Sequence, residues 1–511
     1  MSLAILKSRA QLGVTAPPVT IEVFLSGGLP RFSVVGLPEA AVRESKDRVR
    51  GAILSCRFAF PQERITVSLG PADMRKTGGR FDLAIALGIL AARDEVPKQR
   101  FDVFEFYGEL GLNGDIRSVP GVLPAAIRAA EAGHPIIVPR ENGAEASLVA
   151  GEAYVANSLL EVTAFLKGAC ELAPVESPPP VEHRSGSPDL ADVKGQRLAK
   201  RALEVAAAGR HNILFCGPPG TGKSMLAQRL PGILPAMSEA EAIETAAVDS
   251  VLGRSFDLAR WRQRPFRSPH HTASAIALVG GGSDPRPGEI SRAHNGVLFL
   301  DELPEFSRHV LEVLREPMES GWTTISRAGR QADFPARFQL VAAMNPCPCG
   351  YLGDPAGDCH CSAERVTRYR GRISGPLLDR IDIHMPVHRP TIKSLRPDAP
   401  SEEASIDVAR RVAAARSIQF ERAGLCNAEL SGSHLEAAFA AEDQGWSLLD
   451  RAAEKLALSA RAYQRVQRVA RTIADLAGEE TIRKQHVAEA LALRVPGKRT
   501  SIASSGMWER L

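Results

Sequence analysis

The chain has 511 residues and a formal net charge of +4, with 44% hydrophobic and 24% charged residues. These fractions are typical of a soluble globular protein, and the length predicts about three domains. The low net charge excludes a polybasic nucleic-acid coat. Local basic loops remain compatible with nucleic-acid binding, because that binding depends on where the charges lie.

The sequence predicts a cytoplasmic protein with no membrane contact. Its start, MSLAILKSRAQLGV, has too short an apolar run for a signal peptide and lacks a small-residue cleavage site. The longest apolar run, FDLAIALGILAA at 81–92, is shorter than the ~20 residues that a membrane span needs. Cytoplasmic thiols stay reduced, so clustered cysteines favour metal or redox chemistry over disulfides.

Residues 1–170 are expected to form an α/β domain. A strand-like run at 65–69 lies between helical patterns at 38–54 and 121–133, and a second strand-like run follows at 134–139.

Three further regions follow. Residues 171–190 are rich in proline, lack apolar periodicity and are expected to be a linker. Residues 191–395 alternate helices with short apolar strands, which indicates a parallel sheet covered on both faces. Residues 396–511 contain amphipathic patterns and few strand signals, so a helical region is expected there.

A phosphate-binding motif, GPPGTGKS, occupies 217–224. It matches the P-loop pattern, follows an apolar strand and opens a helix, which is the context that supports this motif. Glycines let backbone N–H groups surround phosphate oxygens, the lysine reaches the β/γ-phosphates, and the serine hydroxyl holds Mg²⁺. The expected ATP-binding residues are Gly217, Pro218, Pro219, Gly220, Thr221, Gly222, Lys223 and Ser224.

Two later strands end in polar residues that suit the same site. GVLFLDE at 296–302 is a Walker B pattern, in which Asp301 supports Mg²⁺ beside Ser224 and Glu302 orients or deprotonates the attacking water. The strand LVAAMN ends at Asn345, which is expected to reach the γ-phosphate or the water.

Two arginines have two interpretations each. Arg380, in GPLLDRIDIH, is either a surface ion-pair partner of a neighbouring aspartate or a finger that reaches another subunit's γ-phosphate. Arg461 begins a helix of the third region. It is either solvated or a sensor of the γ-phosphate bound by its own chain.

Four cysteines lie close together in NPCPCGYLGDPAGDCHCS at 345–362: Cys347, Cys349, Cys359 and Cys361. Two C-x-C pairs across a short loop predict a tetrahedral zinc site, with His360 as an alternative ligand and Asp354 and Asp358 as second-layer carboxylates. Unliganded reduced cysteines and a redox switch are the alternatives. A zinc ion would order a loop that is too rich in glycine and proline to have its own core.

These motifs together resemble the YifB/ComM family of magnesium-chelatase-like AAA+ ATPases. The similar segments include FRSPHHTASAIALVGGG, PGEISRAHNGVLFLDELPEF, RISGPLLDRIDIH and LSARAYQRVQRVARTIADLAG, and they cover essentially the whole chain. The resemblance implies a P-loop core with Asn345 as sensor 1, Arg380 as arginine finger and Arg461 as sensor 2. It also implies a homo-hexameric ring, because a finger acts on a neighbouring subunit.

The resemblance further implies insertions that project into the ring pore. The candidates are 276–296, with Arg286 and Arg292, and 322–340. The arginines of the second candidate are Arg327, Arg330 and Arg337. Such arginines either contact nucleic-acid phosphates without reading sequence or are simply solvated. His270 and His271 are expected to have a structural or loop role in preference to binding a metal.

The N-terminal region resembles the ribosomal-S5-domain-2-like fold of the Lon-protease type. Where the catalytic lysine would lie, this sequence has Leu123 or Pro124, and the stretch 75–87 contains no serine. Thr77 and Lys76 are neighbours in sequence, so they do not replace a positioned nucleophile and base. A domain without peptidase activity, used for assembly or for partner contact, is therefore expected.

The resemblance implies an ATP-driven motor on DNA, such as a branch-migration helicase that works with recombination proteins in natural transformation. A metal-chelatase motor, an ATP-dependent protease and a protein remodeller are the alternatives. The missing dyad disfavours the protease, and the extra N-terminal domain disfavours the chelatase.

Overall fold

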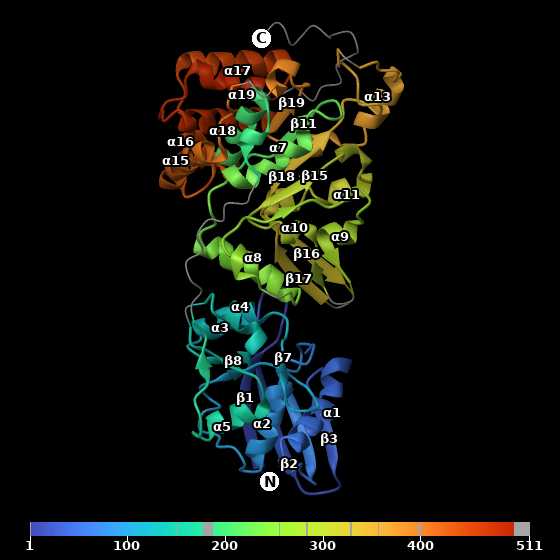
Figure 1. Ribbon diagram of the computed structural model, residues 1–511, viewed down its shortest axis with the longest axis vertical. Helices are drawn as coiled ribbons and strands as arrows, with labels where there is room; N and C mark the ends of the chain where they lie inside the picture. The colour runs from blue at the N-terminus through green and yellow to red at the C-terminus, as the bar shows by residue number, and fades with distance from the viewer. Residues whose placement is uncertain are drawn as a thin grey trace.

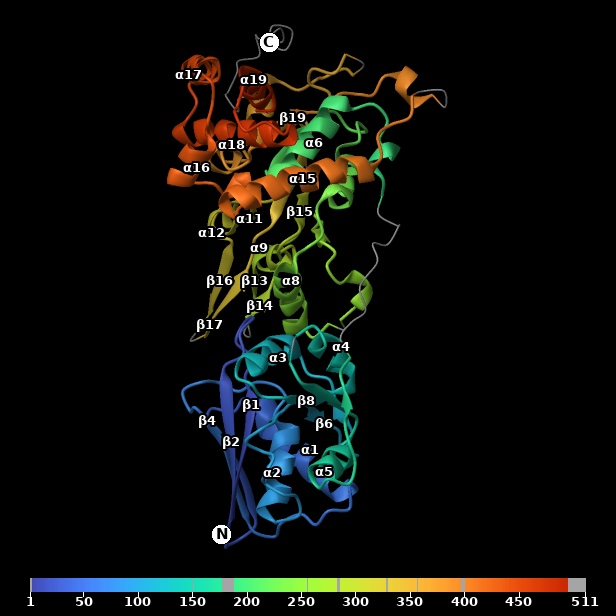
Figure 2. The ribbon, with the colours of Figure 1, turned by 90° about the vertical axis from the view of Figure 1, so that its left-hand side faces the viewer.

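The structure is a computed structural model that describes residues 2–149, 151–176, 188–254, 256–282, 285–327, 330–355, 357–396 and 400–494. The molecule is elongated, with the N-terminal sheet at one end and the C-terminal helices at the other (Figure 1). The second view, turned by 90°, shows the same separation (Figure 2).

The N-terminal region is built on one mixed sheet with the strand order β10-β9-β8-β5-β1-β2-β4-β3. Its strands are β1 (Ser2–Arg9), β2 (Pro18–Ser26), β3 (Arg31–Val35), β4 (Arg64–Gly70), β5 (Glu105–Phe106), β8 (Ile136–Pro139), β9 (Ala153–Ala156) and β10 (Ala173–Pro174). Strands β1, β2 and β4 pair antiparallel, whereas β3 with β4, and β1, β5, β8 and β9 in turn, pair parallel. Strand β10 extends this sheet into the expected linker. Residues 177–187 of that linker lie outside the described residues.

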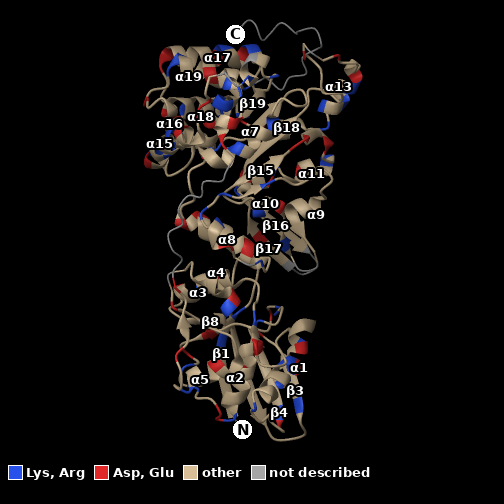
Figure 3. Cartoon of the chain, viewed as in Figure 1, with Lys and Arg blue, Asp and Glu red and all other residues tan. Residues whose placement is uncertain are grey.

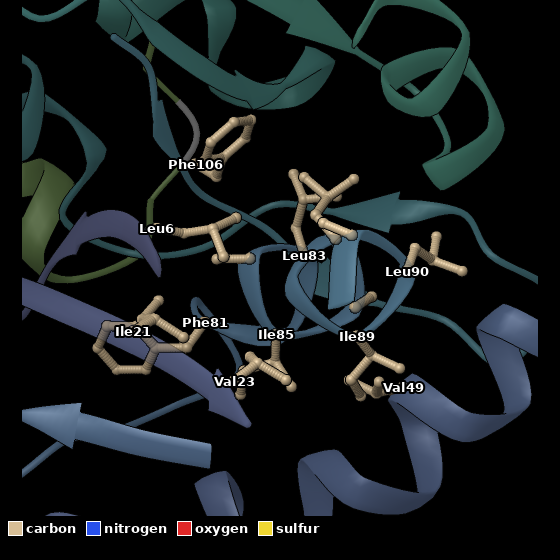
Figure 4. Packing of buried hydrophobic residues seen from close by; sticks show 14 of the residues in the cluster. Leu6, Ile21, Val23, Val49, Phe81, Leu83, Ile85, Ile89, Leu90 and Phe106 are labelled. Atoms are coloured by element: carbon tan, nitrogen blue, oxygen red, sulfur yellow. The ribbon is translucent and has the colours of Figure 1, made fainter. Parts of the chain in front are cut away.

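Five helices accompany this sheet: α1 (Ala40–Ser55), α2 (Asp82–Ala92), α3 (Val122–Glu131), α4 (Gly143–Ala146) and α5 (Leu159–Leu166). Helix α2 is the apolar run of the sequence, and every one of its residues is buried. It lies between the sheet and α1, where Ile85 and Ile89 face Val23 and Val49 (Figure 4). Because α2 has neighbours on all sides, it carries no polar face. Among the described residues, no helix is long and apolar enough to cross a membrane.

The central sheet has five strands in the order β12-β15-β18-β11-β19, and every neighbouring pair is parallel. The strands are β12 (Phe266–Arg267), β15 (Val297–Leu300), β18 (Gln339–Met344), β11 (Ile213–Cys216) and β19 (Ile383–Pro386). Alternate residues of β11 and β15 belong to two different apolar clusters, one on each face. The expected parallel α/β core, covered on both faces, is confirmed.

Helices cover both faces of this sheet. One face packs on α6 (Arg197–Gly209), α7 (Lys223–Arg229) and the C-terminal helices, and the other on α9 (Ala275–Val279), α10 (Glu289–Arg292), α11 (Arg308–Val313) and α14 (Gly375–Leu378). The expected helical C-terminal region is also confirmed. It consists of α15 (Ser405–Ala423), α16 (Gly432–Ala438), α17 (Asp443–Leu456), α18 (Ala460–Leu476) and α19 (Lys484–Ala492).

The two candidate insertions have regular structure between the central sheet and the N-terminal region. Residues 276–296 contain the end of α9, the small ladder β13 (Gly280–Gly281) and β14 (Arg286–Pro287), and α10. Residues 322–340 contain the hairpin β16 (Trp322–Arg327) and β17 (Arg330–Pro335), followed by the start of β18.

Helix α8 (Glu239–Val251) joins the two halves of the molecule. The N–H of Gly121, just before α3, donates to the carbonyl of Ser250 at 2.8 Å. The N–H of Leu123 donates to the hydroxyl of Ser250 at 3.2 Å. The side chain of Leu123 is fully buried in a cluster with Ala246 and Ala247. The N-terminal region, through α3, and the central region, through α8, therefore share a packed contact.

Candidate nucleotide site

The P-loop lies where β11 ends and α7 begins. Gly220 and Gly222 have φ angles of +74° and +90°, a region that glycine adopts without strain. Nothing lies within 4 Å of a Cβ added at either position, so their backbone faces open space. The hydroxyl of Thr221 donates to the carbonyl of Pro218 at 2.9 Å and braces the turn. The loop is thus preformed.

Lys223 is buried within this loop. Its Nζ donates to the carbonyls of Gly217 at 2.7 Å and Pro218 at 2.8 Å, and to Oδ1 of Asn345 at 3.1 Å. Burial lowers the pKa of the Lys223 amine from its ordinary value. A phosphate that enters the loop would offer this amine a stronger acceptor than the neutral oxygens do. Asn345 therefore lies beside the P-loop lysine, where the sequence predicted a sensor.

The Mg²⁺ residues predicted from the sequence also meet. The hydroxyl of Ser224 donates to Oδ2 of Asp301 at 2.6 Å. Hydroxyl and carboxylate oxygens are the ligands that Mg²⁺ prefers, so this pair fits the ion. The next residue, Glu302, has a φ of +51°, and its N–H donates to Oδ1 of Asp301 at 2.9 Å.

His271 contacts the predicted catalytic carboxylate. Its Nδ1 lies 3.1 Å from Oε2 of Glu302, and its ring lies against that of His270, with centroids 4.1 Å apart. The sequence did not reveal this contact. Strand β12, which leads to the histidines and lies beside β15, has only two residues and leaves no strand pattern. The structure therefore assigns His271 a place next to Glu302, and this is a loop role of the kind expected.

Arg380 lies at the amino ends of the strands of the central sheet, whereas the P-loop lies at their carboxyl ends. The side-chain amide of Asn212, just before β11, donates to the carbonyl of Arg380 at 3.3 Å. The P-loop begins after β11 at Gly217. Because a strand advances about 3.3 Å per residue, Gly217 lies roughly 16 Å from Asn212, at the other end of β11. Arg380 therefore lies away from the P-loop of its own chain.

Arg461 lies on the same side as Arg380. Both guanidinium groups approach Oε1 of Glu319, at 2.5 Å for Arg380 and 3.9 Å for Arg461. One turn further along α18, Arg465 pairs with Asp382, whose N–H donates to the carbonyl of Asn212 at 3.1 Å. This placement does not favour the expected role of Arg461 as a sensor of its own chain's nucleotide. Helix α18 itself packs mainly on α6, α15 and α19.

The four cysteines converge as predicted. Their sulfur atoms all lie within 4.8 Å of one another, and three of the separations are 3.3, 3.6 and 3.7 Å. Zinc with four thiolates at ~2.3 Å has sulfur atoms about 3.8 Å apart, so the cluster fits a tetrahedral ion. The side chain of His360 is 81% exposed and pairs with Asp358. Asp354 instead pairs with Arg389 at 2.7 Å.

The cysteine loop also touches the nucleotide site. Gly350 has a φ of +88°, and a Cβ added there would lie 2.7 Å from the ring of Pro219. A side chain at position 350 would therefore push against the P-loop.

The basic residues of the two insertions differ in their surroundings. Arg286 and Arg337 are exposed. Arg292 is nearly buried and pairs with Glu289, which also accepts two hydrogen bonds from Arg267. Because it is held in this way, Arg292 is not the free basic side chain that the sequence predicted. The side chains of Arg327 and Arg330 lie outside the described residues. Basic and acidic residues are interspersed along the whole chain (Figure 3).

In the N-terminal region, Lys76 is fully buried. Its amine donates to the carbonyls of Pro71 and Met74, and the latter distance is 2.7 Å. The domain without peptidase activity that the sequence predicts stays a prediction.

Comparison with known proteins matches three parts of the chain to magnesium chelatase. Residues 189–395 match "Magnesium chelatase, subunit ChlI", residues 21–142 match "Subunit ChlI of Mg-chelatase", and residues 402–494 match "Magnesium chelatase, subunit ChlI C-terminal".

Relatives of full length are also found. The competence protein ComM of Haemophilus influenzae is 51% identical over 500 residues, which cover 97% of this chain and 98% of the relative. YifB of Escherichia coli is 47% identical over 497 residues, with 97% of each chain covered. The chain belongs to the YifB/ComM family of magnesium-chelatase-like AAA+ ATPases. A magnesium-chelatase 38 kDa subunit of Cereibacter sphaeroides is 29% identical over 176 residues, or 30% of this chain.

Membership of the YifB/ComM family implies an ATPase core that uses ATP and Mg²⁺, and the geometry at Lys223, Ser224 and Asp301 suits both. AAA+ proteins commonly form oligomers. The N-terminal region matches the chelatase family over 21–142, whereas its likeness to the S5 and Lon-type fold stays a prediction.

Proposed function

We propose that the chain is one subunit of a homo-hexameric, Mg-ATP-driven ring motor that acts on DNA, as a branch-migration helicase in recombination or natural transformation. The observation that supports it best is the division of the site. Lys223, Asp301 and Asn345 lie at the carboxyl ends of the strands of the central sheet, and Arg380 lies at their amino ends. Such a division needs a neighbouring subunit to complete the site.

Each residue has a distinct part in the proposed hydrolysis. Lys223 leaves the loop carbonyls and neutralises the β/γ-phosphates. Glu302 turns from His271 towards the attacking water and accepts its proton, and Asn345 orients that water. Mg²⁺, when bound at Ser224 and Asp301, offsets phosphate charge. Arg380 and Arg461 of the next subunit stabilise the charge that develops on the terminal phosphate.

DNA is the proposed substrate for two reasons. The full-length relative from Haemophilus influenzae is named a competence protein. The exposed Arg286 and Arg337 belong to the two insertions, where they suit contacts to a phosphate backbone without base readout. We also propose a structural zinc ion on the four cysteines, which would fix the segment between Asn345 and Arg380.

A decisive test mixes two inactive variants. Lys223→Ala removes nucleotide binding and Arg380→Ala removes the finger, so each protein alone is expected to lose ATP turnover. In mixed rings, Arg380→Ala subunits that lie next to Lys223→Ala subunits have an intact P-loop and an intact neighbouring finger. Turnover should therefore return on mixing. No recovery in rings shown to be mixed would refute the trans site.

DNA dependence is tested separately. Single-stranded, duplex and branched DNA are added to the wild-type ATPase assay, and a mobile four-way junction is followed for branch migration. ATP turnover that is indifferent to all three, with no junction processed, would refute the DNA motor. A protein-remodelling or chelatase-type motor, which the partial similarity to a magnesium-chelatase subunit supports, would then be preferred.

A further inference from the structure

The guanidinium of Arg380, the proposed finger, is buried within its own subunit in this structure. Its side chain is only 6% exposed. Nη2 lies 2.5 Å from Oε1 of Glu319, and Nη1 donates to the carbonyl of Pro376 at 2.8 Å. The Nε atom is buried and has no hydrogen-bond partner among the described residues. In this conformation the guanidinium is held by groups of its own chain.

Glu319 belongs to α12 (Pro317–Ser320) and is half-exposed. The same carboxylate oxygen lies 3.9 Å from Nη2 of Arg461, which is 60% exposed. The hydrogen bond from Arg380 lowers the pKa of Glu319, and the charge of Arg461 lowers it further. One ionised carboxylate therefore faces both arginines, and it pairs closely with Arg380 and only at longer range with Arg461.

Glu319 and Arg380 line an open cleft of about 360 Å³. Its lining residues are Glu312, Arg315, Glu316, Glu319, Ser320 and Arg380. Glu319 is the exposed partner of the pair, so a phosphate that enters the cleft meets this carboxylate before it reaches Arg380. Because carboxylates predominate in it, an incoming phosphate meets repulsion as well as the buried guanidinium.

We propose that Glu319 is a positioning residue that holds Arg380 and Arg461 away from the neighbouring nucleotide until its terminal phosphate displaces the carboxylate. This rests on the proposed function. Two anions compete for one guanidinium, and a phosphate, with more charge and more acceptor oxygens, replaces the carboxylate. The buried Nε, which now has no partner, gains one when Arg380 leaves its pocket. Glu319 thus opposes assembly of the subunits into the ring until ATP is present.

The test is Glu319→Gln, which keeps the shape of the side chain and removes its charge. Assembly is driven by a non-hydrolysable ATP analogue with Mg²⁺ and followed by light scattering against protein concentration. We expect the concentration for half-maximal assembly to fall about tenfold, or about 1.4 kcal/mol. Glu316→Gln removes a like charge from the same cleft but pairs with neither arginine, so it should leave the concentration near the wild-type value.

A double-variant comparison separates the proposed role from a structural one. In an Arg380→Ala background, Glu319→Gln should change assembly much less, because the main interaction that it releases is already gone. An unchanged or higher assembly concentration in Glu319→Gln alone would overturn the proposal. So would an equal effect with and without Arg380. A wild-type chain that assembles but does not hydrolyse ATP would refute the proposed function and leave this assembly test intact.

Discussion

Replacing Asp382 with asparagine should strongly destabilise the ATPase core. The carboxylate is buried, pairs with Arg465 of α18, and accepts the N–H of Asn212 at 2.9 Å. Asparagine preserves the size and the bond from Asn212, but it leaves the largely buried guanidinium of Arg465 without its anion. Breaking one partner of a buried pair costs about 3–5 kcal/mol. Since Arg465 retains 15% exposure, we expect about 3 kcal/mol.

Calorimetry of the full chain measures this loss. The transition of the ATPase core is identified by its upward shift with ADP and Mg²⁺. For a unit of this size, about 3 kcal/mol corresponds to a fall in Tm of roughly 6–10 °C. Asp407→Asn is the matched control. Asp407 forms an exposed pair with Arg410 on α15, and its loss should cost less than about 1 kcal/mol. Equal shifts for the two variants would refute the reasoning.

The same pair predicts a pH dependence. Burial alone would raise the pKa of Asp382, but the charge of Arg465, the nearby His211 ring at 3.8 Å and the hydrogen bond from Asn212 outweigh it and hold the pKa well below its ordinary value. A depressed carboxyl pKa gives stability that is complete above the unfolded value of about 3.9 and is lost as the pH falls below it. The difference between wild type and Asp382→Asn should therefore be constant from about pH 7 to 5 and shrink below pH 4. A difference that grows on acidification would contradict this.

Three other variants test separate parts of the structure. His271→Ala should raise basal ATP turnover by no more than about fivefold, because a partly exposed pair with Glu302 is worth about 0–1 kcal/mol, and a loss of turnover would contradict that. Cys349→Ser should reduce bound zinc, measured by elemental analysis, from about one equivalent to less than half, whereas exposed Cys170→Ser should not. Less than half an equivalent in the wild type would refute the zinc site. Leu123→Ala should weaken the contact with α8 by about 3 kcal/mol. Amide hydrogen exchange at the end of α8 should therefore become faster, while the amides of α7 stay protected. Equal protection of α8 in both proteins would refute the contact.

Local motifs made the nucleotide site predictable. The P-loop, the strand before Asp301 and the cysteine pairs are each contiguous in sequence, and Asn345 follows a strong apolar strand. Each of these groups follows the carboxyl end of a strand, and the carboxyl ends of β11, β18 and β15 lie together in the parallel sheet. The contacts of Lys223 with Asn345 and of Ser224 with Asp301 therefore agree with the predicted site.

Long-range contacts could not be predicted in this way. Arg380, Arg461 and Glu319 meet although they come from three distant segments, and Glu319 carries no motif. Arg292 resembles a free basic side chain in sequence, whereas the fold places Glu289 and Arg267 beside it. Strand β10 escaped prediction because two residues leave no periodicity. These outcomes depend on tertiary packing and not on local propensity.

Helix α8 connects the N-terminal region, which it contacts at α3, with the residues just before β15. Its last turn is held at Ser250 by the segment before α3, and near its start the carbonyl of Glu241 accepts from the side chain of Asn295 at 3.2 Å. The latter residue stands just before β15, which leads to Asp301. With 13 residues at about 1.5 Å each, helix α8 is roughly 20 Å long. A displacement of the N-terminal region is therefore expected to move the base of the strand that leads to Asp301, the proposed magnesium ligand.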